Sequence, residues 1–337
     1  MDQGGNPGGA VRSRLLAVTR PYGRAQTARS MVQLGVTFCL WAASYAAAHC
    51  MIGDWPLVGM SCAALAACFV VRLFMIQHDC GHRSFFTSSV ANDRLGFWLG
   101  VITMTPYHCW RRFHAQHHAH SGNLDQRGVG DILTLTRREY EALSPARQRW
   151  YRIYRNPVVM LLIGPPLLFV LRQRTTYKVP QAWRLERRSV HLTNLALVAG
   201  LLPLALLPEP WQALGLHLAM MSMAAIAGVW LFYVQHQFSE AYWEHAPRWE
   251  SWRASMHGAS YYRLPAPLRW LTANIGLHHI HHLDARIPNY RLFECFTRHP
   301  EFAEPPTLGI RDSLRCVRLR LWDEEQQRMV PFPAGGA

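Results

Sequence analysis

Three histidine clusters in this sequence have spacings suited to metal binding. Residues 78–82 read HDCGH, residues 114–118 read HAQHH and residues 278–282 read HHIHH. On a helix, side chains three or four residues apart lie on one face, so each cluster can turn its imidazoles to one side. The HxxxH pattern and the two HxxHH patterns together supply the imidazoles of His78, His82, His114, His117, His118, His278, His281 and His282. His279 lies inside the third cluster, but the spacing does not require it as a ligand.

The number of imidazoles says more about the expected metal site than their spacing does. Imidazole binds Zn, Cu, Fe and Ni, so the pattern alone does not choose the metal. A structural zinc site is complete with four ligands, whereas eight histidines suit two metal ions of higher coordination with positions left for oxygen. The clusters therefore indicate a dinuclear redox centre. The alternative is a solvated surface that binds metal nonspecifically.

Four apolar runs are each about long enough to cross a membrane as helices, since a hydrocarbon core of roughly 30 Å needs about 20 apolar residues. They cover residues 31–50, 55–76, 190–207 and 211–234, and short turns at 53–54 and 208–210 pair them into two hairpins. Two shorter apolar stretches, 96–107 and 157–171, are expected to be interfacial, and Pro165-Pro166 interrupts the second. The predicted fold is an all-α integral membrane protein, with two transmembrane helical hairpins (four spans) and a helical cap.

Positive charge sets the expected orientation of the hairpins. Five arginines lie within residues 1–30 and more basic residues precede the second hairpin, whereas neither outer turn carries Lys or Arg. By the positive-inside rule, both hairpins open toward the cytoplasm. Residues 1–30 are then a basic cytoplasmic segment, and all three histidine clusters lie in a cytoplasmic cap.

The composition also narrows the class of protein. Half of the 337 residues are hydrophobic and 17% are charged, with a formal net charge of +14. No nucleic-acid recognition motif accompanies this charge, and the arginines flank the apolar runs, so anionic membrane lipid is the better partner and no nucleic acid is expected. No cysteine pair has a CxxC or zinc-like spacing, which argues against a disulfide framework.

Several stretches around the clusters resemble the membrane fatty acid desaturases, especially bacterial enzymes of the omega-6 or Delta-12 type. They include NIGLHHIHHLDARIPNY at 274–290, which is the most specific, LFYVQHQF at 231–238 and SYYRLP at 260–265. WRR at 110–112 precedes the second cluster, and SGNLD and RGVGD follow it. The resemblance covers roughly residues 30–320. It implies a membrane desaturase domain over 31–322, with 323–337 expected to form a disordered tail.

The resemblance also implies further site residues. In the family, a histidine between the second and third clusters completes a set of nine around two non-haem irons, and His236 within LFYVQHQF is assigned to that role. Outer-shell groups commonly orient metal-bound imidazoles. The candidates for this supporting role are Asp79, Asp125, Asp131, Asn274 and His279.

The activity implied by the resemblance is oxygen-dependent desaturation of a fatty acyl chain at a di-iron centre. O2 would be the cosubstrate, a ferredoxin-like or other carrier protein the external electron donor, and a bacterial inner membrane the location. Alternatives on the same scaffold are an acetylenase or a hydroxylase. A more remote alternative is a non-enzymatic membrane metal-binding protein or transporter, although transporter ligands are expected at mid-membrane rather than outside the spans.

Overall fold

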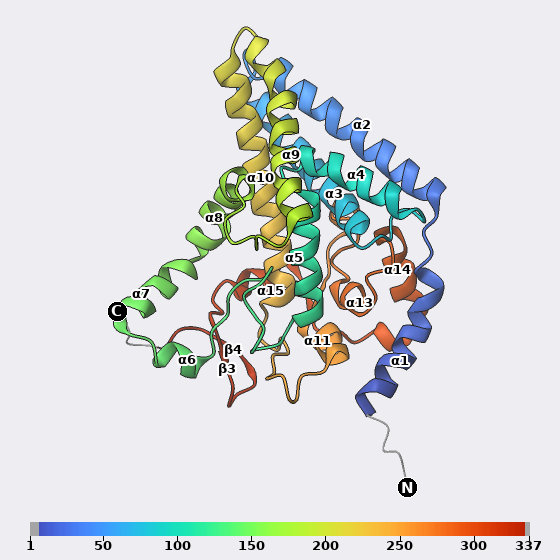
Figure 1. Ribbon diagram of the computed structural model, residues 1–337, viewed down its shortest axis with the longest axis vertical. Helices are drawn as coiled ribbons and strands as arrows, with labels where there is room; N and C mark the ends of the chain where they lie inside the picture. The colour runs from blue at the N-terminus through green and yellow to red at the C-terminus, as the bar shows by residue number, and fades with distance from the viewer. Residues whose placement is uncertain (1–6, 334–337) are drawn as a thin grey trace.

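The computed structural model describes residues 7–333 and is mostly helical (Figure 1). The four apolar runs form the long helices α2 (Thr27–Met51), α3 (Pro56–Gly81), α9 (Arg184–Leu201) and α10 (Pro210–His236). Within the described residues, four helices are each long and apolar enough to cross a membrane, the third counted together with its extension to Leu206. They form the expected hairpins, α2 with α3 and α9 with α10, whose turns meet at the top of Figure 1. The predicted all-α membrane fold is confirmed.

The tight turns between these helices follow from local sequence. Pro56 and Pro210 occupy the first turns of α3 and α10, where the missing N–H of proline would have no helical partner in any case. Gly59 lets α3 pass close to the end of α2, because a Cβ at this position would lie 2.6 Å from the Cα of Ile52. Helix α3 is therefore held close to α2, and it packs on its other sides against α4 and α10.

Most of the shorter helices form a cap below the hairpins in Figure 1, whereas α4 (Ser89–Ile102) lies beside α3 and α9. Two short parallel strands, β1 (Tyr261–Tyr262) and β2 (Thr307–Leu308), tie distant parts of this cap together. Short 3-10 turns occupy Arg20–Tyr22, Arg172–Arg174, Leu202–Leu206 and Pro300–Phe302. The helices of the cap are α1 (Pro7–Thr19), α5 (Tyr107–His120), α11 (Ser251–Gly258), α12 (Ala266–Leu271), α13 (His278–Leu283), α14 (Asn289–Arg298) and α15 (Ile310–Cys316).

The two shorter apolar stretches differ from each other in secondary structure. Residues 96–107 are divided between the end of α4, a turn and the first residue of α5. The stretch 157–171 is helical throughout, so Pro165-Pro166 does not break it; α8 (Gly164–Pro166) lies between the π-helical turns Val158–Ile163 and Leu167–Leu171. The wider π-helical turns use i→i+5 bonds, which accommodates prolines that would disrupt an α-helix.

The break in this region lies just before the stretch rather than within it. Helix α7 (Pro145–Tyr154), which follows α6 (Arg137–Glu141), and residues 158–174 are bent by 52°. Pro157 follows Asn156, and a proline disfavours helical geometry in the residue before it. Counted together, the bent pair would be long and apolar enough for a fifth span, or for a re-entrant segment.

The expected disordered tail at 323–337 is wrong for the residues that the structure describes. Strand β3 (Leu321–Asp323) pairs antiparallel with β4 (Arg328–Val330). Trp322 and Met329 are almost fully buried, and their burial stabilises the hairpin against the chain around Thr136. Residues 334–337 lie outside the described part of the chain.

Candidate metal centre

The first histidine cluster lies where α3 ends. His78 is in the last turn of the helix and His82 directly follows it, with the N–H of His82 donating to the carbonyl of His78 at 3.1 Å. The two rings are 4.7 Å apart between centroids. Both imidazoles are therefore held on the end of a span that packs against six other helices of the described chain.

The second cluster lies on α5, where His114 and His118 face the end of α3 and His117 faces the end of α10. The indole ring of Trp110, one turn earlier, stacks on His114 with the ring centroids 4.6 Å apart. The loop after α5 returns to the helix at Gly130, which has a φ of +74°. A Cβ there would lie 2.8 Å from the carbonyl oxygen of Phe113 and 3.3 Å from Cβ of His117, so only glycine allows this close approach.

The third cluster forms the short helix α13, in which every histidine is buried. His236 is the last residue of α10 and lies against α13, with its Nε2 atom 3.0 Å from that of His278. Its Nδ1 lies 3.1 Å from the carbonyl oxygen of Gly258. If Nδ1 carries the proton and donates it to this carbonyl, Nε2 keeps a free lone pair that points toward the other histidines.

The nine histidines converge into two groups. All candidate ligand atoms of a group lie within 4.8 Å of one another. The first group consists of His78, His82, His114, His118 and His281, and the second of His117, His236, His278 and His282. The groups divide the sequence clusters, because His117 turns away from the other histidines of α5 and His281 from those of α13. Side chains at positions i+3 and i+4 of a helix point in directions about 100° apart, so one short helix can provide ligands to two centres.

Short distances between ring nitrogens characterise both groups. In the first group, Nε2 of His114 lies 3.0 Å from that of His82 and 3.1 Å from that of His118. In the second, Nε2 of His117 lies 3.1 Å from that of His236. These nitrogens face one another rather than carboxylates, which is the arrangement of a ligand cage around a cation.

The electrostatics of the site favour neutral imidazoles. Burial, followed by the proximity of other histidines, lowers the pKa of the cap histidines well below the usual range. This holds for His82, His114, His117, His118, His278, His281 and His282. A neutral imidazole is the form that binds a metal ion. The residues present therefore fit a site for two metal ions.

Two of the predicted supporting residues, Asp79 and Asn274, belong to one hydrogen-bonded network beside the first group. Asp79 Oδ1 lies 3.6 Å from His78 Nδ1, and Asp79 Oδ2 accepts hydrogen bonds from the backbone and side-chain N–H groups of Asn289 at 2.8 and 2.7 Å. Asn274 donates to the carbonyl of Asn289 at 3.0 Å. The sequence did not identify Asn289 as a supporting residue, because only its position in the 274–290 stretch distinguishes it.

The other three candidates lie apart from this network. Asp125 is on the surface, where it accepts a hydrogen bond from Ala246 N–H at 2.8 Å and contacts His245, which belongs to neither group. Asp131 accepts from Gly128 N–H and lines a space beside His117, and burial raises its pKa to about 6. His279 is fully buried against aromatic rings and is not among the convergent histidines.

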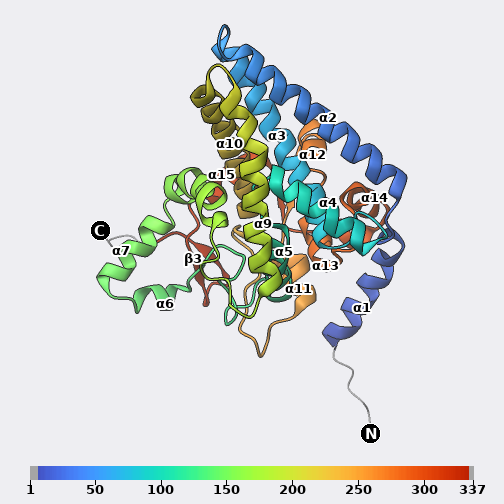
Figure 2. The ribbon, with the colours of Figure 1, turned by 45° about the horizontal axis from the view of Figure 1, so that its top comes forward.

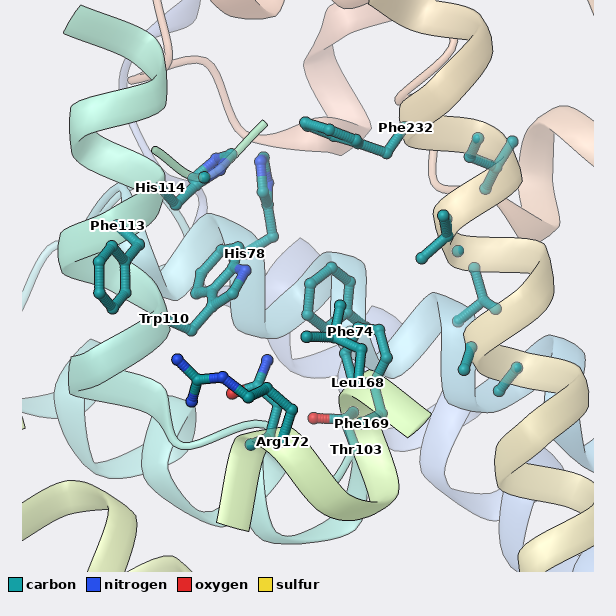
Figure 3. Close-up of a pocket in the computed structure, with 18 of the residues that line it drawn as sticks. Phe74, His78, Thr103, Trp110, Phe113, His114, Leu168, Phe169, Arg172 and Phe232 are labelled. Atoms are coloured by element: carbon teal, nitrogen blue, oxygen red, sulfur yellow. The ribbon is translucent and has the colours of Figure 1, made fainter. Parts of the chain in front are cut away.

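An apolar cavity of about 520 Å³ leads to the two groups (Figure 3). Its lining includes His78 and His114 of the first group and His278 of the second. Figure 3 shows His78 and His114 on one side of the cavity, opposite Phe232 of α10, with Phe74 and Phe169 further from the histidines. Most of the lining is apolar, and it comes from α3, α5, α10 and the π-helical segment. A long hydrocarbon chain matches this environment.

Comparisons with known proteins agree with this arrangement. The family model described as fatty acid desaturase matches residues 53–313. A fatty acid desaturase of Bacillus subtilis is 40% identical over 93% of this chain and 88% of its own length. The sn-1 oleoyl-lipid 12-desaturase of Synechocystis is 26% identical over 77% of this chain and 69% of its own length. The sn-1 acyl-lipid omega-3 desaturase (ferredoxin) of Nostoc is 28% identical over 66% of this chain and 62% of its own length. With nine histidines gathered at the end of an apolar cavity, this chain belongs to the fatty acid desaturase family.

Proposed function

We propose that the nine histidines hold two iron ions and that the protein desaturates a fatty acyl chain lying in the apolar cavity. The observation that carries this proposal is the shared boundary of the cavity with both histidine groups. Five imidazoles would hold one ion and four the other. Once bound, the iron pair with O2 would supply the oxidising power that side-chain acid–base chemistry lacks for an unactivated methylene.

The protein's own contribution is to bind the chain and fix its position. Aromatic and aliphatic side chains of the cavity exclude water and hold the hydrocarbon, and the bond to be oxidised is selected by how deeply the chain enters. The hydrogen bonds of Asp79 with Asn289 hold the end of α3, and with it His78, in a fixed orientation.

The electron donor and the carrier of the acyl chain are inferred from relatives. The Nostoc relative is named for ferredoxin, and its name and that of the Synechocystis relative specify lipid-bound acyl chains. We infer a ferredoxin-like donor and a lipid-bound substrate, with the histidine groups facing the cytoplasm of a bacterial inner membrane. Basic residues before both hairpins support that orientation.

Gas chromatography and mass spectrometry of fatty acids from cells expressing the chain would test the proposal, with His281→Ala as the control. A new unsaturated acid that is absent from the control is expected, and derivatisation would locate its double bond. A triple bond would favour an acetylenase and an alcohol a hydroxylase. An unchanged lipid profile from iron-loaded protein supplied with ferredoxin, ferredoxin reductase and acyl-lipid would contradict the proposal and favour a non-enzymatic metal-binding protein.

A further inference from the structure

A second concave site lies beside α3 and is lined by different residues from the acyl cavity. It is an open groove of about 760 Å³ between the start of α2, the middle of α3, and helices α12 and α14. Figure 2 shows α12 and α14 next to α2 and α3. Arg72 of α3 faces this groove, whereas Val70, Val71 and Met75 of the same helix line the acyl cavity.

Three arginines line the groove, and neutral groups hold each of them. Arg72 donates to Thr37 Oγ1 at 3.1 Å and to the carbonyl of Trp270, and it lies over the indole of Trp270 at 4.1 Å. Arg29 donates to the carbonyl of Tyr290 at 3.1 Å. Arg269 lies 3.6 Å over the ring of Phe293. Within residues 7–333, none of the three forms an ion pair with a carboxylate, and no acidic residue lines the groove.

The position of Arg72 makes this uncompensated charge unusual. Its side chain is only 6% exposed, and it lies six residues before His78 in an apolar span, roughly 9 Å along the helix axis. Ionisable residues within a span are costly and normally serve a function. The Nη2 atom of Arg72 donates to no acceptor in the described chain, so the guanidinium can still bind an anion.

The rim of the groove matches a lipid rather than a soluble ligand. Val32 and Val36 of α2 line it and are 66% and 45% exposed on a helix that would cross the membrane. Trp270 and Tyr290 add amphipathic rings of the kind found at headgroup level. A ligand there would have its phosphate among the guanidinium groups and its acyl chain along α2.

We propose that this groove binds the phosphate headgroup of an anionic phospholipid from the surrounding bilayer. Guanidinium groups recognise phosphate through several donors in a fixed plane, which favours Arg29, Arg72 and Arg269 as the contacts. The groove shares no lining residue with the acyl cavity, and its far wall includes Asn274 and Asn289 of the Asp79 network. Phosphate binding by the arginines needs no metal ion, so binding measurements on the purified full-length protein can test it without an activity assay.

The test compares phosphatidylglycerol, phosphatidylcholine and inorganic phosphate as ligands, by native mass spectrometry and thermal unfolding. The variant is Arg29→Gln/Arg269→Gln, because both side chains are at least partly exposed and can be replaced without opening the core. The matched control is Arg147→Gln/Arg149→Gln on α7, which removes the same charge from exposed positions outside the groove.

We expect the wild type and the control to bind phosphatidylglycerol in preference to phosphatidylcholine. The groove variant should bind phosphatidylglycerol roughly thirtyfold more weakly, since each basic residue near an anionic lipid surface contributes about fivefold in affinity. Equal affinities of the groove variant and the control would overturn the proposal, as would equal binding of the two lipids to the wild type. Stabilisation by inorganic phosphate that matches that by phosphatidylglycerol would show a free-anion site instead of a lipid site.

Discussion

Replacing Gly228 by leucine should shorten the acyl chain that the protein can use. Met221, Ala225, Gly228 and Phe232 of α10 all line the cavity at helical spacing, which places Gly228 in the middle of the lining stripe. A Cβ added at Gly228 meets no atom within 4 Å, so a side chain introduced here begins in open space at the cavity wall.

The magnitude follows from the volume that the new side chain occupies. Excluding about three methylenes of substrate, at about 0.8 kcal/mol each, removes about 2.4 kcal/mol of binding, or roughly sixtyfold in kcat/KM for the longest chains. Helix propensity favours leucine over glycine by roughly 0.5 to 1 kcal/mol, so the thermal stability of the variant should not fall.

The assay compares product distributions for acyl chains of graded length by gas chromatography and mass spectrometry. The control is Gly215→Leu, because Gly215 lies on the same helix, has equally open surroundings and does not line the cavity. The product profile of Gly228→Leu should shift to shorter chains while that of the control stays like the wild type. Identical profiles for the two variants would show that the acyl chain does not lie along this face of α10.

Three further changes test other parts of the structure. Asp79→Ala leaves two buried N–H groups of Asn289 without acceptors and should lower the free energy of unfolding by about 2 to 6 kcal/mol. Asp79→Asn keeps one acceptor oxygen and should lower this free energy by less than half as much. Equal losses for the two variants in thermal unfolding would contradict this account. His118→Ala should lower both the activity and the iron content, which elemental analysis would measure. The control, His245→Ala on the surface, should change neither. An active, fully iron-loaded His118→Ala protein would refute the assignment of His118 as a ligand. Met329→Ala should lower the free energy of unfolding by about 2 to 5 kcal/mol, because Met329 is 1% exposed and its loss leaves a cavity. An unchanged melting temperature would mean that β4 does not contribute to the core.

The sequence alone determined the membrane fold and the set of histidines that converge. Apolar runs of about 20 residues predict spans because the hydrocarbon thickness sets their length, and the same local pattern gave two hairpins. The HxxxH and HxxHH spacings named eight of the nine convergent histidines, and the resemblance of 231–238 to the desaturases supplied His236. These features are readable because each depends on residues close together in the chain.

Several local expectations failed, some because of contacts with distant segments and one because of the local form of the helix. Residues 323–333 are ordered by pairing and burial against the chain near Thr136, which composition does not reveal. Pro165-Pro166 remains helical because π-helical turns flank it, and the bend lies at Pro157 instead. Of the predicted supporting residues, Asp125 lies with a surface histidine rather than with the candidate ligands.

Tertiary structure alone decided how the histidines are shared between two centres. His117 joins the second group and His114 and His118 the first, because α5 lies between the end of α3 and the end of α10. The role of Asn289, the course of the cavity and the groove at Arg72 likewise depend on which helices become neighbours. Spacing along one helix fixes only the relative directions of its side chains, whereas the partner that each meets is set by the packing of segments far apart in the chain.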